Sequence, residues 1–445
     1  MNRRIPPAPP LPDGTISTMA NLIQSNADRG IPTQRSGAAI RFISGPATRA
    51  DTLLLISALF LQRFLVPFHG TYLSLNLVAV GTILLHQFFS GGLLIAYDRL
   101  LWFLLFVLVA TSSLLLNFEG YMLTGYLQFT VFYALFMLRR PSNLDRYAET
   151  LHTFQFLVML LSCVAVAQFV AQFVVNGTTL SNFYWVFPDY LFAYHNTSRT
   201  FGPGIIKSNA LFLGEPSTLS QLTALGILIE VLEFGRPKYL LVMALGFLVA
   251  YSGTGLMLLS FLPLAGLRHG KAGLSVLLVI AFMLGLAVTG IIDVSAFSSR
   301  VSEFDTRGTS GYDRFVSPFI LADNQFKSVP LLQLLMGSGP GTIKFFASTW
   351  ENHWYTGGFA EDWIKILYEY GIIGSFLFIC FLVISFRRSQ CPGLVRAAII
   401  LAFVFLEGGM TLAIPLCTLA APKLRGRINA AARYGPPRVA ASTVG

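Results

Sequence analysis

Long apolar runs separated by short polar turns dominate the chain after about residue 50. Several of these runs approach the roughly 20 apolar residues that an α-helix needs to cross a bilayer. The pattern predicts transmembrane helices in the segments Thr52–Phe68, Tyr72–Phe89, Leu100–Leu116, Tyr121–Leu138, Leu151–Val175, Pro216–Phe234, Tyr239–Tyr251, Gly255–Leu267, Ala272–Ile292, Trp363–Phe386 and Leu394–Ala421. The last segment is long enough for one span or for two short helices, so we expect eleven or twelve spans.

Two long polar stretches, 176–215 and 293–362, interrupt this pattern. Loops longer than about 15 residues are generally functional or disordered. These two are rich in aromatic residues, Gly, Arg and Asp, unlike a flexible linker. The first 50 residues are rich in Pro, Ser, Asn and Gly, which predicts a disordered basic arm. We therefore expect a membrane domain at 51–421 with two large outer loops, between the arm at 1–50 and a basic tail at 422–445.

Composition and charge narrow the fold class. The chain is 54% hydrophobic and 12% charged, about half the charged share of an ordinary soluble domain. An all-α polytopic membrane protein remains. Residues 1–50 carry a net charge of +4 and residues 421–445 carry +5, whereas the stretch 293–362 carries −3. Because Lys and Arg collect in cytoplasmic loops, we expect both ends of the chain in the cytoplasm, which favours twelve spans, and both long stretches outside.

The sequence disfavours nucleic-acid binding, a metal or disulfide site, and a transporter function. No RNA- or DNA-binding motif accompanies the basic excess, so we expect attraction to the lipid bilayer and no nucleic-acid partner. The four cysteines form no Cys-x-x-Cys or Cys/His pair, so we expect no disulfide framework, no metal and no cofactor. The predicted spans are nearly free of ionisable residues, whereas a transporter would carry such residues near the bilayer midplane.

The first outer stretch contains a candidate anion site. Glu215-Pro216-Ser217 has the signature of a helix start, with Pro at an early helical position. The free N–H groups of a helix start together with Arg199 would suit an anion. The alternative is that Arg199 only anchors the chain at the level of the lipid headgroups.

The second outer stretch contains three arginines spaced by seven residues, namely Arg300, Arg307 and Arg314. Their guanidinium groups could bracket a diphosphate with paired hydrogen bonds. Nearby acidic residues are equally placed to pair with them. The following segment, Phe315–Phe326, is amphipathic and suits a helix in the membrane interface.

Two more features lie at the end of this stretch. Gly337–Gly341 has the glycines of a phosphate loop but lacks the Gly-Lys-Ser/Thr ending, so a tight turn is favoured. His353 is the only histidine of the stretch and is flanked by aromatic residues. A neutral histidine is the usual group for removing a hydroxyl proton near pH 7, although a Trp/Tyr/His interface belt would have the same composition. Glu361 lies just before the next predicted span.

Several short motifs follow one another between about residues 195 and 375. They are Arg-x-x-Gly, Glu-Pro-Ser, the Ser-Gly-x-x-Arg element Ser310–Arg314, Gly-Ser-Gly-Pro-Gly, Asn-His, and Glu-Tyr-Gly-Ile-Ile-Gly at Glu369–Gly374. In this order they resemble the Wzy polymerase and O-antigen ligase superfamily, and most of all its exopolysaccharide-polymerase branch, as in xanthan-type gum assembly. Arg300 and Gly311 also match the Arg-x10-Gly spacing used to describe such polymerases. The resemblance extends over the whole chain by hydropathy.

The resemblance implies a GT-C-like fold in the bacterial inner (cytoplasmic) membrane, with an inverting, metal-independent glycosyltransferase site that faces the periplasm. The donor would be an oligosaccharide on undecaprenyl diphosphate, and the acceptor a hydroxyl of another lipid-linked repeat. His353 would be the catalytic base. The diphosphate-binding candidates are Arg199, Arg300 and Arg314, and the secondary candidates are Glu215, Arg307 and Glu361. A chain-length regulator and export machinery would be partners.

The chain also departs from the family pattern. Relatives often carry Ser-Arg at the end of a middle span, where this chain has Tyr251–Gly255, so Arg300 or Arg314 would have to compensate. Two other functions stay open. One is a glycan or O-antigen ligase of the same superfamily, and the other is a non-catalytic transporter or flippase of polysaccharide or lipid-linked sugar.

Overall fold

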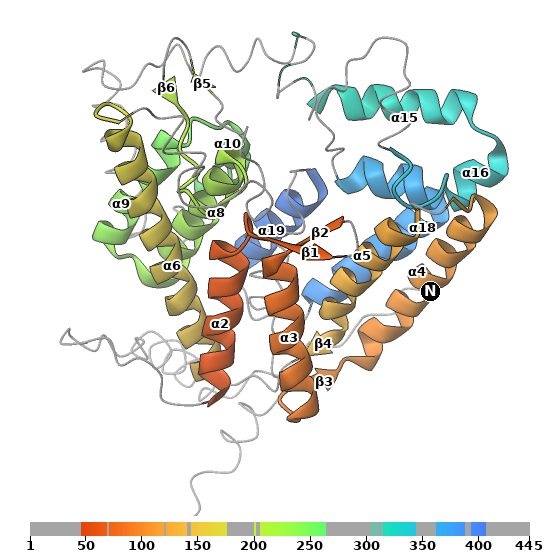
Figure 1. Ribbon diagram of the computed structural model, residues 1–445, viewed down its shortest axis with the longest axis horizontal. Helices are drawn as coiled ribbons and strands as arrows, with labels where there is room; N and C mark the ends of the chain where they lie inside the picture. The colour runs from red at the N-terminus through yellow and green to blue at the C-terminus, as the bar shows by residue number, and fades with distance from the viewer. Residues whose placement is uncertain are drawn as a thin grey trace, which may run out of the picture. The chain divides into compact units, whose positions relative to one another are not determined.

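The structure, a computed structural model, is predominantly helical (Figure 1), in agreement with the expected all-α class. Its strands, among the residues described, form three short two-stranded antiparallel sheets. The described residues are 46–68, 71–119, 122–139, 144–175, 200–201, 205–263, 305–306, 309, 312, 315–343, 362–387 and 393–405.

The first expected span is shorter than its apolar run. The elements are α2 (Pro46–Phe60), the hairpin strands β1 (Leu65–Phe68) and β2 (Thr71–Ser74), and α3 (Leu75–Phe89). The prediction of one apolar helix over Thr52–Phe68 is wrong, because the helix ends at Phe60. Arg63 lies in the turn that follows, and Pro67 has no backbone N–H with which to continue a helix.

The expected span Tyr72–Phe89 is helical from Leu75. The three expected spans that follow it are also helices, the third of which begins several residues before its apolar run. They are α4 (Tyr97–Leu116), α5 (Met122–Ala134) with a 3₁₀ turn η1 (Leu135–Met137), and α6 (Leu144–Ala171). Strands β3 (Leu94–Ile95) and β4 (Leu138–Arg139) pair before α4 and after α5. The start of α4 is therefore hydrogen-bonded to the end of α5, as two consecutive antiparallel helices require.

The middle of the chain contains a hairpin and three helices. They are β5 (Thr200–Phe201) with β6 (Ile205–Ile206), α8 (Pro216–Ile229) with a π-helical end η3 (Glu230–Phe234), α9 (Pro237–Val249) and α10 (Thr254–Leu259). Gly235 adopts φ 68° in the turn between α8 and α9, a conformation that glycine reaches without strain.

The last described helices are α15 (Ser317–Ser328), α16 (Leu331–Met336), α18 (Asp362–Arg387) and α19 (Gly393–Phe405). The amphipathic segment expected near Phe315–Phe326 is thus helical. Helix α18 is broken at Gly371, whose φ of 68° and ψ of −173° are not helical. It consists of two consecutive helices, and sequence alone predicted one.

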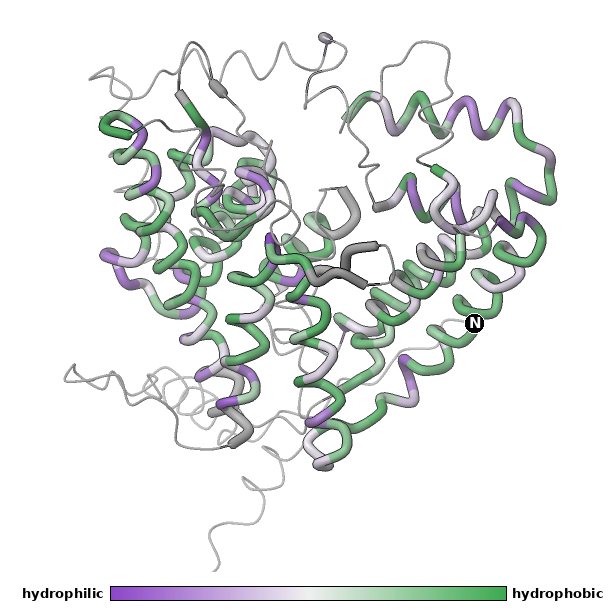
Figure 2. Tube along the Cα trace, viewed as in Figure 1, coloured by the Kyte–Doolittle hydropathy of each residue, from purple (hydrophilic) through white to green (hydrophobic). Residues whose placement is uncertain are grey.

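Four of the described helices are long and apolar enough to cross a membrane, at Tyr97–Leu116, Glu149–Ala171, Pro216–Phe234 and Trp363–Arg387. Shorter apolar helices lie at Leu75–Phe89, Gly125–Met137, Pro237–Val249 and Gly393–Ala402. Figure 2 shows that apolar residues predominate along α4. The expected span Ala272–Ile292 lies outside the described residues. So does the part of the last expected segment, Leu394–Ala421, that follows Phe405.

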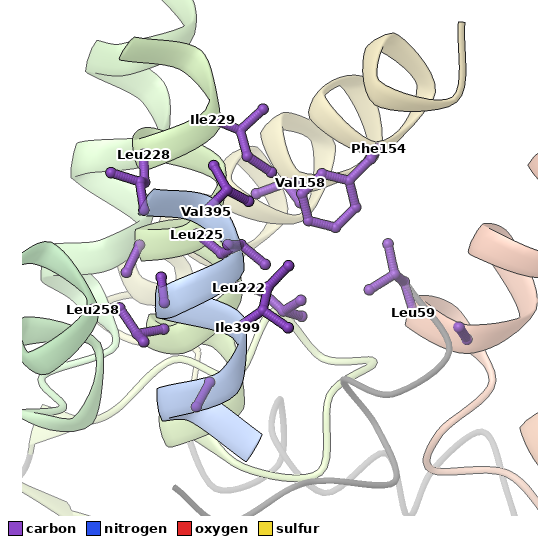
Figure 3. Close-up of a cluster of buried hydrophobic side chains, with 14 of the residues drawn as sticks. Leu59, Phe154, Val158, Leu222, Leu225, Leu228, Ile229, Leu258, Val395 and Ile399 are labelled. Atoms are coloured by element: carbon purple, nitrogen blue, oxygen red, sulfur yellow. The ribbon is translucent and has the colours of Figure 1, made fainter. Parts of the chain in front are cut away.

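The apolar core forms where α6, α8 and α19 meet. In Figure 3, Leu222 and Leu225 of α8 lie beside Ile399 of α19, with Phe154 and Val158 of α6 on the other side. All of α8 from Pro216 to Ile229 is buried. Helix α8 is therefore enclosed by protein, and its first turn is held in a defined place.

A second part of the core is aromatic and lies between α4, α5 and α18. The ring of Phe106 is 5.6 Å from that of Phe129, 5.3 Å from that of Tyr370 and 5.4 Å from that of Phe378. Aromatic pairs with tilted or edge-on rings at such distances stabilise a core beyond the area they bury. The break in α18 at Gly371 is thus flanked on both sides by well-packed rings.

Contacts between helix ends follow a consistent alternation. At the ends expected outside, Arg63 after α2 contacts Leu211 before α8, and Ser208 before α8 contacts Val249 at the end of α9. At the ends expected inside, the ring of His152 in the first part of α6 lies 4.4 Å from that of Phe234 at the end of η3. Each contact joins ends that the hydropathy pattern assigns to the same side of the membrane.

Candidate functional site

The start of α8 is one part of the candidate site. Glu215 is the N-cap residue, and Pro216 is at the first helical position, as the sequence predicts. The Ser217 hydroxyl donates a hydrogen bond of 2.9 Å to Oε2 of Glu215. Because the side chain of Glu215 is half-buried and turned back to the first turn of α8, its carboxylate shares the end of the helix where N–H groups favour negative charge.

A strained turn precedes this helix. Ala210 and Leu211 have positive φ angles of 54° and 65°, which are uncommon for residues other than glycine and cost of the order of 1–3 kcal/mol each. Side chains of the same turn compensate. The amide N–H of Leu211 donates to Oδ1 of Asn209 at 3.1 Å, and Nδ2 of Asn209 donates to the carbonyl of Leu213 at 2.9 Å.

Helix α6 holds this turn from one side. Gln168 accepts a hydrogen bond of 2.6 Å from the hydroxyl of Ser208 and donates one of 3.2 Å to Oδ1 of Asn209. Directly after the end of α6, Oε1 of Gln172 accepts from the backbone N–H of Ile206 in β6 at 2.8 Å. Strand β6 pairs with Thr200 of β5, the residue directly after Arg199, so α6 fixes the chain that continues from Arg199.

Arg63 holds the same turn from the other side. Its Nη1 donates a hydrogen bond of 2.8 Å to the carbonyl of Leu211, and its side chain is fully buried. Burial lowers the pKa of Arg63 to about 10, so the guanidinium stays charged at neutral pH. Sequence reasoning did not single out Arg63. The available signal was a lone arginine inside an apolar run.

The segment that departs from the family pattern packs on α8. Hydroxyl oxygens of Ser220 and Thr254 lie 3.1 Å apart, and those of Ser252 and Thr254 lie 3.0 Å apart. A Cβ added at Gly255 would lie 2.5 Å from the carbonyl oxygen of Ser220. Small residues let α10 approach α8 this closely, so Ser252–Gly255 supports the helix that Glu215 caps.

The Gly337–Gly341 segment forms the second part of the candidate site. It is a turn, as favoured from sequence, and it docks on the break in α18. The backbone N–H groups of Ser338 and Gly339 donate to the carbonyls of Tyr368 and Glu369 at 2.9 and 3.1 Å. Gly337, Gly339 and Gly341 all have positive φ. The glycines therefore serve backbone conformation and close approach.

Helix α4 completes this docking site. The Ser113 hydroxyl donates to the Glu369 carbonyl at 2.8 Å, and Nδ2 of Asn117 donates to the Gly337 carbonyl at 3.2 Å. These bonds link the C-terminal end of α4 to both the glycine turn and the break in α18.

An apolar cluster joins the elements on the other side of this turn. Its members are Leu321, Ala322, Ile343, Ile364 and Tyr368. Ile343 is the last described residue before the segment 344–361, and Ile364 follows that segment closely. Both ends of the segment that carries His353 are thus fixed in one packed cluster.

Most residues expected at the site lie outside the part of the chain that the structure describes. Glu215 is described, and it caps α8. The expected residues outside the described ranges are Arg199, Arg300, Arg307, Arg314, His353 and Glu361. Their roles stay predictions, supported by the described residues on which their segments begin and end.

The described residues contain no cluster of three or more His, Cys, Asp or Glu side chains that could hold a metal ion. The expectation of a metal-independent reaction remains a prediction.

Comparison with known proteins identifies the family. The sequence profile of the WcaD colanic acid polymerase family matches residues 51–414. None of the curated proteins matches the chain significantly. The profile covers all the described helices after the first five residues of α2 and most of the chain. It confirms the resemblance to Wzy-type exopolysaccharide polymerases inferred from the motifs, and with it a polymerase of the glycosyltransferase type in a membrane. The chain belongs to the WcaD colanic acid polymerase family, a Wzy-type polymerase family.

Proposed function

We propose that the protein lengthens an exopolysaccharide by transferring a glycan from undecaprenyl diphosphate to a hydroxyl of another lipid-linked repeat unit. The acceptor oxygen forms a bond to the anomeric carbon while the bond from that carbon to the diphosphate breaks. The hydroxyl proton passes to a base, and undecaprenyl diphosphate leaves. Attack from the face opposite the leaving group inverts the anomeric centre. Membership of a polymerase family is the observation that carries this proposal.

Charge stabilisation is the main requirement of this reaction, since a diphosphate gains negative charge as it leaves. Arg199 with Arg300 or Arg314 would supply it through paired hydrogen bonds, with Arg307 as a secondary candidate. Support comes from the start of α8, where the hairpin β5–β6 and the turn at Asn209–Leu211 connect Arg199 to Glu215 over a short, well-anchored path. No metal is invoked.

His353 is our candidate base for the acceptor hydroxyl. Glu361, which directly precedes α18, is a secondary candidate in the same segment. This assignment is supported by the described residues before and after the segment that carries His353, which are held in place by packing and hydrogen bonds. The turn at Gly337–Gly341 and the first half of α18 are joined by backbone hydrogen bonds and by a buried apolar cluster. Catalysis by proton transfer requires the base to lie close to the acceptor hydroxyl, and the anchored residues on either side limit how far the segment can reach.

The topology is part of the proposal. We infer twelve spans of a GT-C-like fold in the bacterial inner membrane, with the N-terminal arm and the C-terminal tail in the cytoplasm and the loops 176–215 and 293–362 in the periplasm. The end contacts of α2, α6, α8 and α9 support this order. A chain-length regulator and export machinery would act on the product.

The experiment compares cells that carry Arg199→Ala or His353→Ala with cells that carry Arg387→Ala or His86→Ala, at equal protein levels. The control side chains are exposed and lie at helix ends expected in the cytoplasm. Loss of a general base or of a charge-stabilising donor lowers a rate by about a hundredfold or more. The site variants should therefore accumulate single repeat units on the lipid carrier in the outer leaflet, and the controls should make polymer.

Other outcomes identify the alternatives. Full-length polymer in both site variants would contradict the site assignment. Accumulation of repeat units on the cytoplasmic leaflet would identify a flippase. Long polymer on the lipid carrier, with none joined to a lipid core, would identify a ligase. Elongation of a purified lipid-linked repeat by the purified protein is the direct test of the polymerase reaction.

A further inference from the structure

Helices α15 and α16 expose large apolar side chains on the side expected to face the periplasm. Phe326 is 51% exposed, Leu331 70% and Leu332 61%. Exposed apolar groups gathered in this way mark a surface that contacts a lipid or a protein. None of the motifs assigned to glycosyl transfer includes these three residues.

Helix α15 has two different exposed edges. Its buried face is formed by Leu321, Ala322 and Gln325 and packs toward α18, where Nε2 of Gln325 donates to the carbonyl of Leu367 at 3.3 Å. Phe326 lies on one exposed edge. The other exposed edge carries Asp323 and Lys327, which form an ion pair one turn apart. A helix with adjacent apolar and charged edges, lying on a protein surface, has the design of a helix in the plane of a membrane interface.

The exposed apolar residues of α16 lie close to the C-terminal end of α4, which also exposes apolar residues. Helix α16 packs against both α4 and α18, and the Asn117–Gly337 hydrogen bond ties the outer end of α4 to the end of α16. Leu115 and Leu116, in the last turn of α4, are 70% and 55% exposed. Figures 1 and 2 show α16 at this end of α4 and the apolar residues that run along α4.

The exposed side of α4 identifies the partner. Leu101, Leu104 and Leu108 point out of the described structure along a helix long enough to span the bilayer. In a membrane protein such leucines contact lipid chains. The exposed leucines of α16 extend the same surface past the outer end of the span, and the ion pair on α15 suits the water side of the headgroups.

We propose that α15 and α16 lie in the outer interface of the bilayer, with Phe326, Leu331 and Leu332 inserted among the outer-leaflet acyl chains. The glycine turn begins directly after α16, and Ile343, the last described residue before the segment that carries His353, packs with Leu321 and Ala322 of α15. The depth of α15 in the lipid would therefore set the depth at which that segment begins. The inference rests on the membrane span α4 and does not require the transfer reaction.

The test measures depth with nitroxide labels on the full chain in phospholipid nanodiscs. The background carries Ala at the four native cysteines, Cys163, Cys380, Cys391 and Cys417. Labels are placed by Phe326→Cys, Leu331→Cys and Leu332→Cys. The water-side control is Lys327→Cys and the deep control is Leu108→Cys. All five labelled side chains are at least half exposed. Lys327→Cys removes only the exposed ion pair with Asp323, and a single symmetric elution peak checks the fold of each labelled protein.

Collision with oxygen, which concentrates in lipid, is compared with collision with a water-soluble nickel chelate. The three test labels should favour oxygen several-fold more than Lys327→Cys does, and less than Leu108→Cys does. Nickel accessibility equal to that of Lys327→Cys would overturn the proposal, because the surface would then face water. Low accessibility to both reagents would also overturn it, because protein from the same chain or a second copy would then cover the surface.

Discussion

A single methyl group at Gly337 should separate the glycine turn from α18. Gly337 has φ 91° and ψ 168°, a region that is essentially reserved for glycine. A Cβ added there would lie 2.2 Å from the carbonyl oxygen of Glu369 and 2.5 Å from the backbone nitrogen of Tyr370. Both atoms belong to the backbone of α18, so no side-chain rotation can relieve the overlap in Gly337→Ala.

The expected loss of stability has two sources. Holding alanine at this φ and ψ costs about 1–3 kcal/mol. Relief of the overlap requires a shift of about 1 Å, since carbon and oxygen atoms normally stay roughly 3.3 Å apart. That shift would stretch the hydrogen bonds from Ser338 to Tyr368 and from Gly339 to Glu369, now 2.9 and 3.1 Å, each worth about 1 kcal/mol. Together these give about 4 kcal/mol.

The chain offers two matched glycine controls. Gly341 has φ 77° but no atom within 4 Å of an added Cβ, so Gly341→Ala meets backbone strain alone. Gly81, inside α3, has neither positive φ nor a close atom, so Gly81→Ala should be neutral or slightly stabilising because alanine favours a helix. Detergent-purified protein is heated stepwise, and the fraction that still elutes as a folded species gives Tm. The Tm should be highest for Gly81→Ala, lower for Gly341→Ala and lowest for Gly337→Ala.

A Tm for Gly337→Ala equal to that of Gly341→Ala would refute the role of close approach. Elongation is also measured at a temperature where every variant remains folded. If the turn positions the segment that carries His353, Gly337→Ala should lower the elongation rate there while Gly341→Ala changes it little. Equal rates in the two variants would leave the turn with a structural role only.

Two further predictions concern buried charges. Arg236→Leu should lower stability by about 3 kcal/mol, because it leaves the fully buried Glu230 carboxylate without its 2.7 Å partner. Adding Glu230→Gln to this variant should recover much of the lost Tm. A double variant with the same Tm as Arg236→Leu would contradict the pairing. Arg63→Leu should cost about 2 kcal/mol by removing the hydrogen bond to Leu211 and should speed limited proteolysis between residues 200 and 215, whereas Arg63→Lys should restore part of the protection. Unchanged proteolysis in Arg63→Leu would show that the turn does not depend on Arg63.

Much of the fold could be predicted from local pattern. Apolar runs located most described helices within a few residues, and Glu215-Pro216-Ser217 marked the start of α8 because Pro at an early helical position is a local preference. The family could also be inferred, since its motifs are short and keep their order. The length of α2 was overestimated. Apolar composition continues through Phe68, but hydropathy does not distinguish a helix from a hairpin containing Pro67.

What the sequence by itself determined is the class of the protein: an apolar helical chain with charge at its ends, loops that carry arginine and histidine, and the motifs of a polymerase family. Only the tertiary structure shows which distant residues contact the segments that carry those motifs. Arg63 meets a turn 148 residues away, and Gly337 meets the break in α18 at Glu369. Periodicity records which face of a helix is buried, whereas the partner of a buried backbone group depends on how distant segments pack, so only the folded chain reveals it.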